Sequence, residues 1–177
     1  MATSTKYKII EATKEVILKN GIDQFTLESV AEEANISKGG LLYHFASKDD
    51  LIEAMNAYAA KDFRKLVMTY VQAGESFHAA YVLATTYTLE NKSILQITTS
   101  LLAALSINRD LLYIWQEEYQ FIQQALANEA MERTTTLLIK AVCDGLWFSA
   151  LFPFQFMSEK EQKEILSYLL LRLQGDD

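Results

Sequence analysis

The sequence predicts an all-α protein in which a small three-helix head is joined by one long helix to a larger helical domain. Half of the 177 residues are apolar, which is enough for a sizeable core. One proline and six glycines leave few of the breaks that β-sandwiches and barrels need between short strands. We expect residues 1–47 to form the head and residues 48–177 the second domain.

The first predicted helix runs from about Lys6 to Asn20. Ile9, Val16 and Ile17 recur at helical spacing and give it an inward apolar stripe. Gly21 follows directly and suits a left-handed C-terminal cap, so the helix is expected to end there.

Residues 26–51 predict two short helices separated by a tight turn. Thr26 can cap the first of them, because its hydroxyl can accept from an unpaired amide two or three residues later. Asn35 and Ile36 interrupt the apolar spacing, and Ser37 offers a second N-cap. Two short helices with a tight turn are the helix-turn-helix pattern, whose second helix enters the major groove of DNA.

Two glycines near the start of that second helix need an explanation. Gly39 and Gly40 each cost about 1 kcal/mol relative to alanine inside a helix. Close approach of the backbone to DNA is one reason for them, and simple fraying of a short helix is the alternative. The helix N-terminus also offers amide groups to phosphate, and Tyr43 and His44 are placed to donate to phosphates or touch base edges.

The rest of the chain predicts one long helix and five further helices. The long helix begins at Lys48, with Ser47 as its cap, and ends near Gly74, so no flexible linker is expected. Ser158 and Glu161 have the spacing of a capping box and open the last helix. The five later helices are expected at residues 77–90, 94–105, 109–127, 129–152 and 158–173.

The charge is distributed unevenly. The net charge is −7, but the first 48 residues hold six lysines and six acidic residues, so the acidic excess lies in the second domain. An acidic second domain would repel DNA and favour docking through the head alone. The single cysteine, Cys143, suits a reducing cytoplasm, and no apolar run is long enough to cross a bilayer.

The first third of the chain resembles the N-terminal domain of TetR-type (tetracycline-repressor-like) bacterial regulators. Residue types and spacing agree together at Ile9, Ile10, Glu11, Ala12, Gly21, Phe25, Thr26, Val30, Ala31, Ile36, Ser37, Lys38, Gly39, Leu41, Phe45, Ser47, Lys48 and Leu51. One departure is Leu42, which stands where the family usually has an aromatic residue. The resemblance implies a phosphate clamp at Lys48. The expected DNA-binding residues are Thr26, Ser37, Lys38, Gly39, Gly40, Tyr43, His44 and Lys48.

The second domain carries many aromatic residues. Buried Tyr and Trp side chains need polar partners, so such groups often line ligand cavities, although ordinary helical core is the alternative. The resemblance implies a small-molecule site in this domain. The expected ligand-binding residues are Phe63, Tyr81, Leu101, Trp115, Tyr119 and Trp147. Acidic residues beside aromatic rings suit a flat, cationic ligand; Glu117, Glu118 and Asp144 are candidates, with solvated carboxylates as the alternative.

The last two helices have broad apolar faces. In the TetR family the corresponding helices make a four-helix dimer interface, and burial within one subunit is the alternative. The expected interface residues are Leu138, Val142, Gly145, Ser149, Ile165, Leu166, Leu169 and Leu173.

The sequence offers little support for catalysis. The two histidines, His44 and His78, lie far apart in the sequence, Cys143 lies in an apolar helix, and no metal-ligand or phosphate-loop spacing occurs. We therefore expect no enzyme activity, cofactor or metal. We expect a cytoplasmic, homodimeric repressor that a small lipophilic ligand, with flat aromatic cations as one class, releases from a palindromic operator. The alternatives are an activator, a ligand-independent regulator, and an enzyme or carrier that uses the aromatic cavity.

Overall fold

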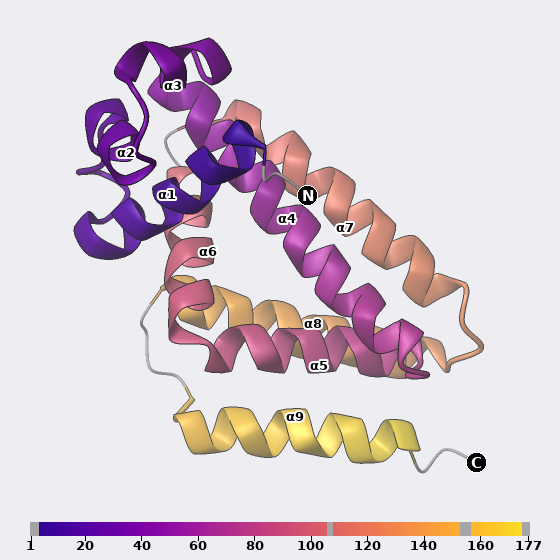
Figure 1. The fold of residues 1–177 in the computed structure, drawn as a ribbon. Helices are drawn as coiled ribbons and strands as arrows, with labels where there is room; N and C mark the ends of the chain where they lie inside the picture. The colour runs from indigo at the N-terminus through magenta and orange to yellow at the C-terminus, as the bar shows by residue number, and fades with distance from the viewer. Residues whose placement is uncertain (1–3, 106–107, 153–156, 175–177) are drawn as a thin grey trace. The chain divides into compact units, whose positions relative to one another are not determined.

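The computed structural model describes residues 4–105, 108–152 and 157–174, and its regular elements in these ranges are helices, which confirms the all-α fold (Figure 1). The helices are α1 (Thr5–Asn20), α2 (Leu27–Glu33), α3 (Lys38–His44), α4 (Lys48–Gln72), α5 (Phe77–Glu90), α6 (Lys92–Ala104), η1 (Arg109–Leu111, a 3-10 helix), α7 (Leu112–Ala127), α8 (Arg133–Leu151) and α9 (Glu159–Gln174). None of the described helices is both long and apolar enough to span a bilayer.

The first compact unit comprises Met1–Ala59 and Gln96–Leu112. Its core forms because α1, α2, α3 and the first half of α4 each turn an apolar stripe inward, and Leu101 of α6 packs into the same core. The largest fully buried side chains of this unit are Ile9, Ile17, Phe25, Val30, Leu41, Leu51, Met55 and Leu101.

The second compact unit comprises Ala60–Leu95 and Tyr113–Asp177. Within it, α5 packs against both α8 and α9 (Figure 1). The mean hydropathy of α5 is high, and both sides of the helix are buried, including Ala80, Val82 and Ala84. Because apolar residues lie on both sides of α5, α8 and α9 can both pack against it.

The packing division differs from the expected domain boundary. It falls inside α4, which is one continuous helix from Lys48 to Gln72, rather than at its start. The reason is that Leu51 and Met55, in the first two turns of α4, belong to the core of the first unit. The division into functional domains at residues 47 and 48 stays a prediction.

Most predicted helix ends agree with the structure to within two residues, and the caps show why. The Ser158 hydroxyl accepts from the Glu161 amide, and the Glu161 carboxylate accepts from the Ser158 amide at 2.7 Å, as a capping box requires. Ser47 accepts from the Asp50 amide at 3.0 Å. Pro153, which directly follows the helix predicted at residues 129–152, lies outside the described residues.

The start of α8 was predicted four residues too early. Glu129 is not its first residue, because its carboxylate accepts from the Phe77 and His78 amides at the start of α5. The helix begins at Arg133, where the Glu132 carboxylate accepts from the Thr134 and Thr135 amides at 2.8 Å. A side chain can cap a helix that is distant in sequence, and local spacing does not reveal this.

Candidate functional sites

α3 turns one face into the core and leaves the opposite face exposed. Leu41 is fully buried and Phe45 nearly so, whereas Tyr43 is 86% exposed. Lys38 and Gly39 are also exposed, and His44 is half-buried with its ring edge-on to Tyr43. The buried pair holds the helix in place, so the exposed residues are presented on a fixed scaffold.

The caps of α2 and α3 fix the helix-turn-helix geometry. The Thr26 hydroxyl accepts from the Ser29 amide at 3.1 Å, and the Ser29 hydroxyl accepts from the Thr26 amide at 3.1 Å. The Ser37 hydroxyl accepts from the Gly40 amide at 3.0 Å. Between the helices, Asn35 has φ of 52°, a left-handed conformation that asparagine tolerates better than most residues. Thr26 and Ser37 therefore have structural roles, and both remain exposed.

The two lysines expected to contact phosphate have different surroundings. Lys38 forms an ion pair with Glu28, and the hydrogen bond from this lysine holds the pKa of Glu28 below its usual value. The Lys48 ammonium lies 4.4 Å from the centroid of the Phe25 ring and donates to the Asp23 carbonyl oxygen at 3.4 Å. No carboxylate in the described part of the chain forms an ion pair with Lys48. Its position is fixed while its charge stays available to an anion.

An aromatic and acidic cluster lies in the second unit, and we define it as Phe63, Tyr81, Tyr119, Asp144 and Trp147. Phe63 makes edge-to-face contacts with the Tyr81 ring at 6.1 Å and the Trp147 ring at 5.9 Å. The Tyr81 hydroxyl donates to Asp144 at 3.2 Å, and the Tyr119 phenol lies close enough to the same carboxylate for its pKa to be affected. Burial, together with the nearby Asp144 carboxylate, raises the pKa of both tyrosines, which therefore remain neutral donors.

The structure brings four of the six expected ligand-binding residues into this cluster. The other two lie outside the cluster. Trp115 is half-buried on α7, and Leu101 is buried in the core of the first unit. Asp144 was expected as one of three acidic residues beside aromatic rings, but its contact with Tyr81 could not be predicted, because the two residues are 63 positions apart in the chain.

The carboxylate of Glu118 forms an ion pair with Arg64. It is buried and accepts two hydrogen bonds from Arg64 Nε, each at 3.0 Å, with a third contact at 2.9 Å to Nη2. The Arg64 guanidinium in turn lies 4.1 Å from the centroid of the Phe121 ring. Arg64 and Glu118 are 54 residues apart, so no local pattern could have predicted this pair.

His78 and Cys143 are both buried in the second unit. His78 is not isolated: its Nδ1 lies 2.6 Å from Glu129 and its Nε2 lies 2.8 Å from the Thr136 hydroxyl. Burial raises the pKa of the Cys143 thiol to about 12, which makes it a poor nucleophile. Both residues act within the core, and the described residues contain no group of three potential metal ligands.

The expected dimer residues divide into buried and exposed sets. Leu166 and Leu169 are each 3% exposed and belong to the core of one chain, so they have little surface to offer a second copy. Ser149 is also buried, whereas Val142, Gly145, Ile165 and Leu173 are half-buried. Leu138 is exposed, together with apolar residues that were not predicted for the interface. These are Leu137 and Phe148 on α8, Phe152 directly after α8, and Tyr168 and Leu171 on α9.

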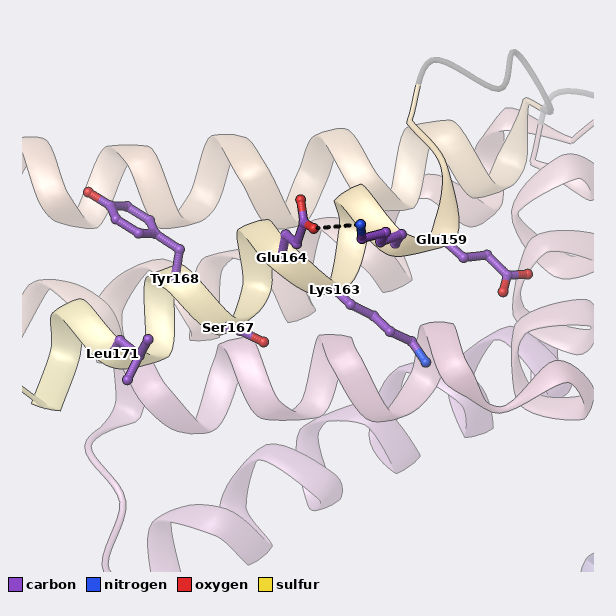
Figure 2. Close-up of a pocket in the computed structure, with 7 residues that line it drawn as sticks. Glu159, Lys163, Glu164, Ser167, Tyr168 and Leu171 are labelled. Atoms are coloured by element: carbon purple, nitrogen blue, oxygen red, sulfur yellow. Dashed lines mark ion pairs between the residues drawn. The ribbon is translucent and has the colours of Figure 1, made fainter.

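A surface hollow runs along α9 beside Tyr168 and Leu171 (Figure 2). Its seven lining residues all come from this one helix, and four of them are charged. The Lys160 ammonium lies 3.7 Å from the Glu164 carboxylate across one turn. A hollow built from a single helix is open on its other sides, so it is not the enclosed cavity expected for a lipophilic ligand.

Known proteins resemble both parts of the chain. Residues 9–55 match the family described as bacterial regulatory proteins, tetR family. Residues 75–173 match the tetracyclin repressor-like C-terminal domain. The HTH-type transcriptional regulator TtgR of Pseudomonas putida is 35% identical over 54 residues, which cover 30% of this chain and 26% of TtgR. The HTH-type transcriptional regulator BetI of Paraburkholderia phymatum is 40% identical over 55 residues, which cover 31% of this chain and 28% of BetI. The chain thus matches about a quarter of the length of these relatives.

A solved structure is similar over almost the whole chain. The multidrug binding protein EbrR in complex with ethidium superposes with a TM-score of 0.72 at 22% identity, covering 98% of this chain and 99% of EbrR. At this identity the likeness concerns the fold. The exposed α3 face, the helical second unit and the two family matches agree, and the chain belongs to the TetR family of bacterial regulatory proteins.

Proposed function

We propose that this chain is a DNA-binding transcriptional repressor that acts as a homodimer in the cytoplasm. The observation that carries the proposal is the exposed face of α3, where Tyr43 and Lys38 project from a helix anchored by Leu41. Family membership supports the same role. In this proposal Tyr43 and Lys38 contact the major groove, and Lys48 binds a phosphate at the edge of the site.

Lys38 needs to exchange partners to contact DNA. In the unbound chain Glu28 holds it, so a phosphate or a base edge must replace that carboxylate. Because both side chains are more than half exposed, the ion pair contributes little and the exchange is inexpensive. Glu28 would then lie near DNA without its lysine partner. Binding should therefore favour DNA sequences or geometries that hold the phosphates away from the Glu28 carboxylate.

The proposed dimer uses the exposed apolar residues of α8 and α9. Leu138 and Phe148 are 52% and 58% exposed on α8, and Tyr168 and Leu171 are 52% and 68% exposed on α9. Several large apolar side chains exposed on two helices favour contact with another protein surface. A dimer would present two recognition helices to half-sites about one DNA turn apart.

Ligand control is the second part of the proposal. A small lipophilic ligand, with flat aromatic cations as the best-supported class, would bind in the second unit and lower operator affinity. The aromatic and acidic cluster supports this class, as does the likeness to EbrR, whose structures include complexes with ethidium, malachite green and proflavin. The ligand need only bind the DNA-incompetent state more tightly to shift the population.

Two measurements test the proposal. Genomic fragments captured by the purified protein should contain a short palindrome, and an electrophoretic mobility shift on that palindrome should be abolished by unlabelled operator. No enrichment of any sequence would reject DNA-specific regulation. Increased transcription from the captured promoter in the presence of the protein would favour an activator instead.

A further inference from the structure

We propose that Leu42 reads one thymine in each half-site of the operator, through the C5-methyl group of that base; this inference rests on the proposed DNA binding. The first step is the position of Leu42 on α3. Leu41 and Phe45 are 0% and 3% exposed and fix the helix on the core of the first unit. Leu42 is 39% exposed and lies outside that core. The fold therefore holds this aliphatic side chain in place and leaves part of its apolar surface uncovered.

The second step concerns the bare backbone beside Leu42. Gly39 precedes Leu42 by three residues and Tyr43 by four, so these two side chains lie on either side of it, one turn later. Side chains on a helix lean toward its N-terminus, which brings both of them toward Gly39. A Cβ added at Gly39 would meet only the Ser37 hydroxyl, at 4.0 Å. A group the size of a methyl can therefore approach the backbone here and contact Leu42.

The third step is the shortage of hydrogen-bonding side chains on α3. Its seven residues include no arginine, asparagine or glutamine, the side chains that read guanine or adenine through two hydrogen bonds. Lys38 forms an ion pair with Glu28, and His44 is half-buried with its ring edge-on to Tyr43. In the major groove, an aliphatic side chain recognises a base by contact with the thymine methyl group. Base recognition by α3 therefore depends on apolar contact more than on paired hydrogen bonds.

The fourth step identifies DNA, rather than another protein, as the partner of this surface. Leu42 and Tyr43 form a patch of two side chains, whereas a stable protein interface uses roughly 20–30 residues from each partner. Lys48 opens the next helix, α4, and its ammonium forms no ion pair with a carboxylate in the described part of the chain. A small apolar patch on a segment that also carries available positive charge suits a base edge with phosphates on either side.

Base analogues test the methyl group directly. Deoxyuridine pairs with adenine as thymidine does and lacks only the C5-methyl group. In the operator captured by the purified protein, each thymidine of a half-site is replaced in turn by deoxyuridine, and affinity is measured by mobility shift. At one position the change should weaken binding by about fourfold, the effect of exposing one methyl-sized group, and by about fifteenfold when both half-sites are changed. Deoxyuridine at the other positions should change the affinity little.

A pair of protein variants assigns that methyl group to Leu42. Leu42→Ala should weaken binding to the natural operator and remove the deoxyuridine effect, because the protein change and the DNA change delete the same contact. Leu112→Ala is the matched control, since Leu112 is also 39% exposed but begins α7. This control should keep both the full affinity and the deoxyuridine effect.

A second analogue tests the methyl group in a different base pair. At the sensitive position the thymine–adenine pair is replaced by a cytosine–guanine pair, with or without a C5-methyl group on the cytosine. The methylated pair should bind about fourfold more tightly than the unmethylated pair. This comparison uses the unchanged protein, so it decides the proposal even if Leu42→Ala does not fold.

Three results would overturn the inference. The first is an operator that tolerates deoxyuridine at every position to within about twofold. The second is a deoxyuridine effect that persists in Leu42→Ala, which would assign the methyl group to another residue. The third is equal binding of methylated and unmethylated cytosine, which would mean that deoxyuridine acts through DNA shape. A captured operator would support DNA binding in all three cases, whereas failure to capture any operator would reject the proposed function and this inference with it.

Discussion

At the scale of single residues, Gly39 stands at a position where the packing of the protein leaves room for a side chain. A Cβ added at Gly39 would meet only the Ser37 hydroxyl at 4.0 Å, so the protein interior does not require glycine there. Gly40 is more restricted, because its Cβ would approach the same hydroxyl at 3.3 Å and disturb the cap of α3. A glycine that the fold does not need supports a role outside the fold.

We therefore expect Gly39→Ala to stabilise the protein and weaken operator binding. The gain in unfolding free energy should be about 0.5–1 kcal/mol, because alanine is the better helix former. Urea unfolding and a mobility shift on the captured operator measure the two effects. Gly40→Ala should gain less stability. Full operator affinity in Gly39→Ala would mean that DNA does not approach this backbone closely.

At the scale of helices, caps explain which boundaries the sequence could predict. Ser37, Ser47 and Ser158 cap the helix that follows them directly, and local spacing predicts such starts. Glu129 caps a helix about fifty residues earlier in the chain, so the start of α8 was predicted wrongly. The same limit applies to the sites. Periodicity identified the apolar band of α9 but could not tell which side the core covers, as Leu169 and Leu171 show.

The cap of α8 should make this helix sensitive to acid. The Thr134 and Thr135 amides donate to Glu132 and lower its pKa to about 2, from an ordinary value of 4.5. Because the folded-state pKa is the lower one, the stabilisation is complete above about pH 4.5 and is lost as the pH falls toward 2.

Glu132→Gln should therefore lower the thermal midpoint at pH 7, and the difference from wild type should shrink between pH 4.5 and pH 2. Thermal unfolding followed by circular dichroism gives both midpoints. Glu117→Gln, an exposed change on α7, should show no such narrowing. A constant difference across this pH range would mean that the charge of Glu132 does not cap α8.

The Arg64–Glu118 pair should show strong coupling between α4 and α7. Arg64→Met leaves a buried carboxylate without its partner and should cost about 2 kcal/mol of unfolding free energy. Replacing both residues by methionine should recover much of this loss, because no unpaired charge remains. Urea unfolding of the two single variants and the double variant gives the coupling. Additive losses would show that the contact contributes no pairwise energy.

At the scale of the whole molecule, DNA binding should depend on salt through the head. Replacing Lys48 by alanine should weaken binding to all sequences and reduce the slope of log affinity against log salt by about one. Lys92→Ala, an exposed lysine on α6, should leave the slope unchanged. An unchanged slope in Lys48→Ala would reject the phosphate clamp.

Assembly should depend on the exposed side of α9. Leu171→Glu should give a folded monomer with weakened operator binding, because residue 171 is 68% exposed within one chain. Leu169→Glu should instead unfold the chain, since it places a charge in the core of the second unit. Sedimentation velocity and circular dichroism distinguish the two results. A Leu171→Glu protein that remains a dimer would move the interface elsewhere.

The burial of the single cysteine makes its labelling rate a measure of local opening in the second unit. A thiol reagent can reach Cys143 only when the second unit opens locally, because the side chain is fully buried and its pKa is about 12. The labelling rate of the unmodified protein therefore reports how often this part of the core is breached, with no engineered probe. Cys143 directly precedes Asp144. A molecule that binds at the aromatic and acidic cluster should therefore lower the labelling rate of Cys143 even when it leaves the fold unchanged.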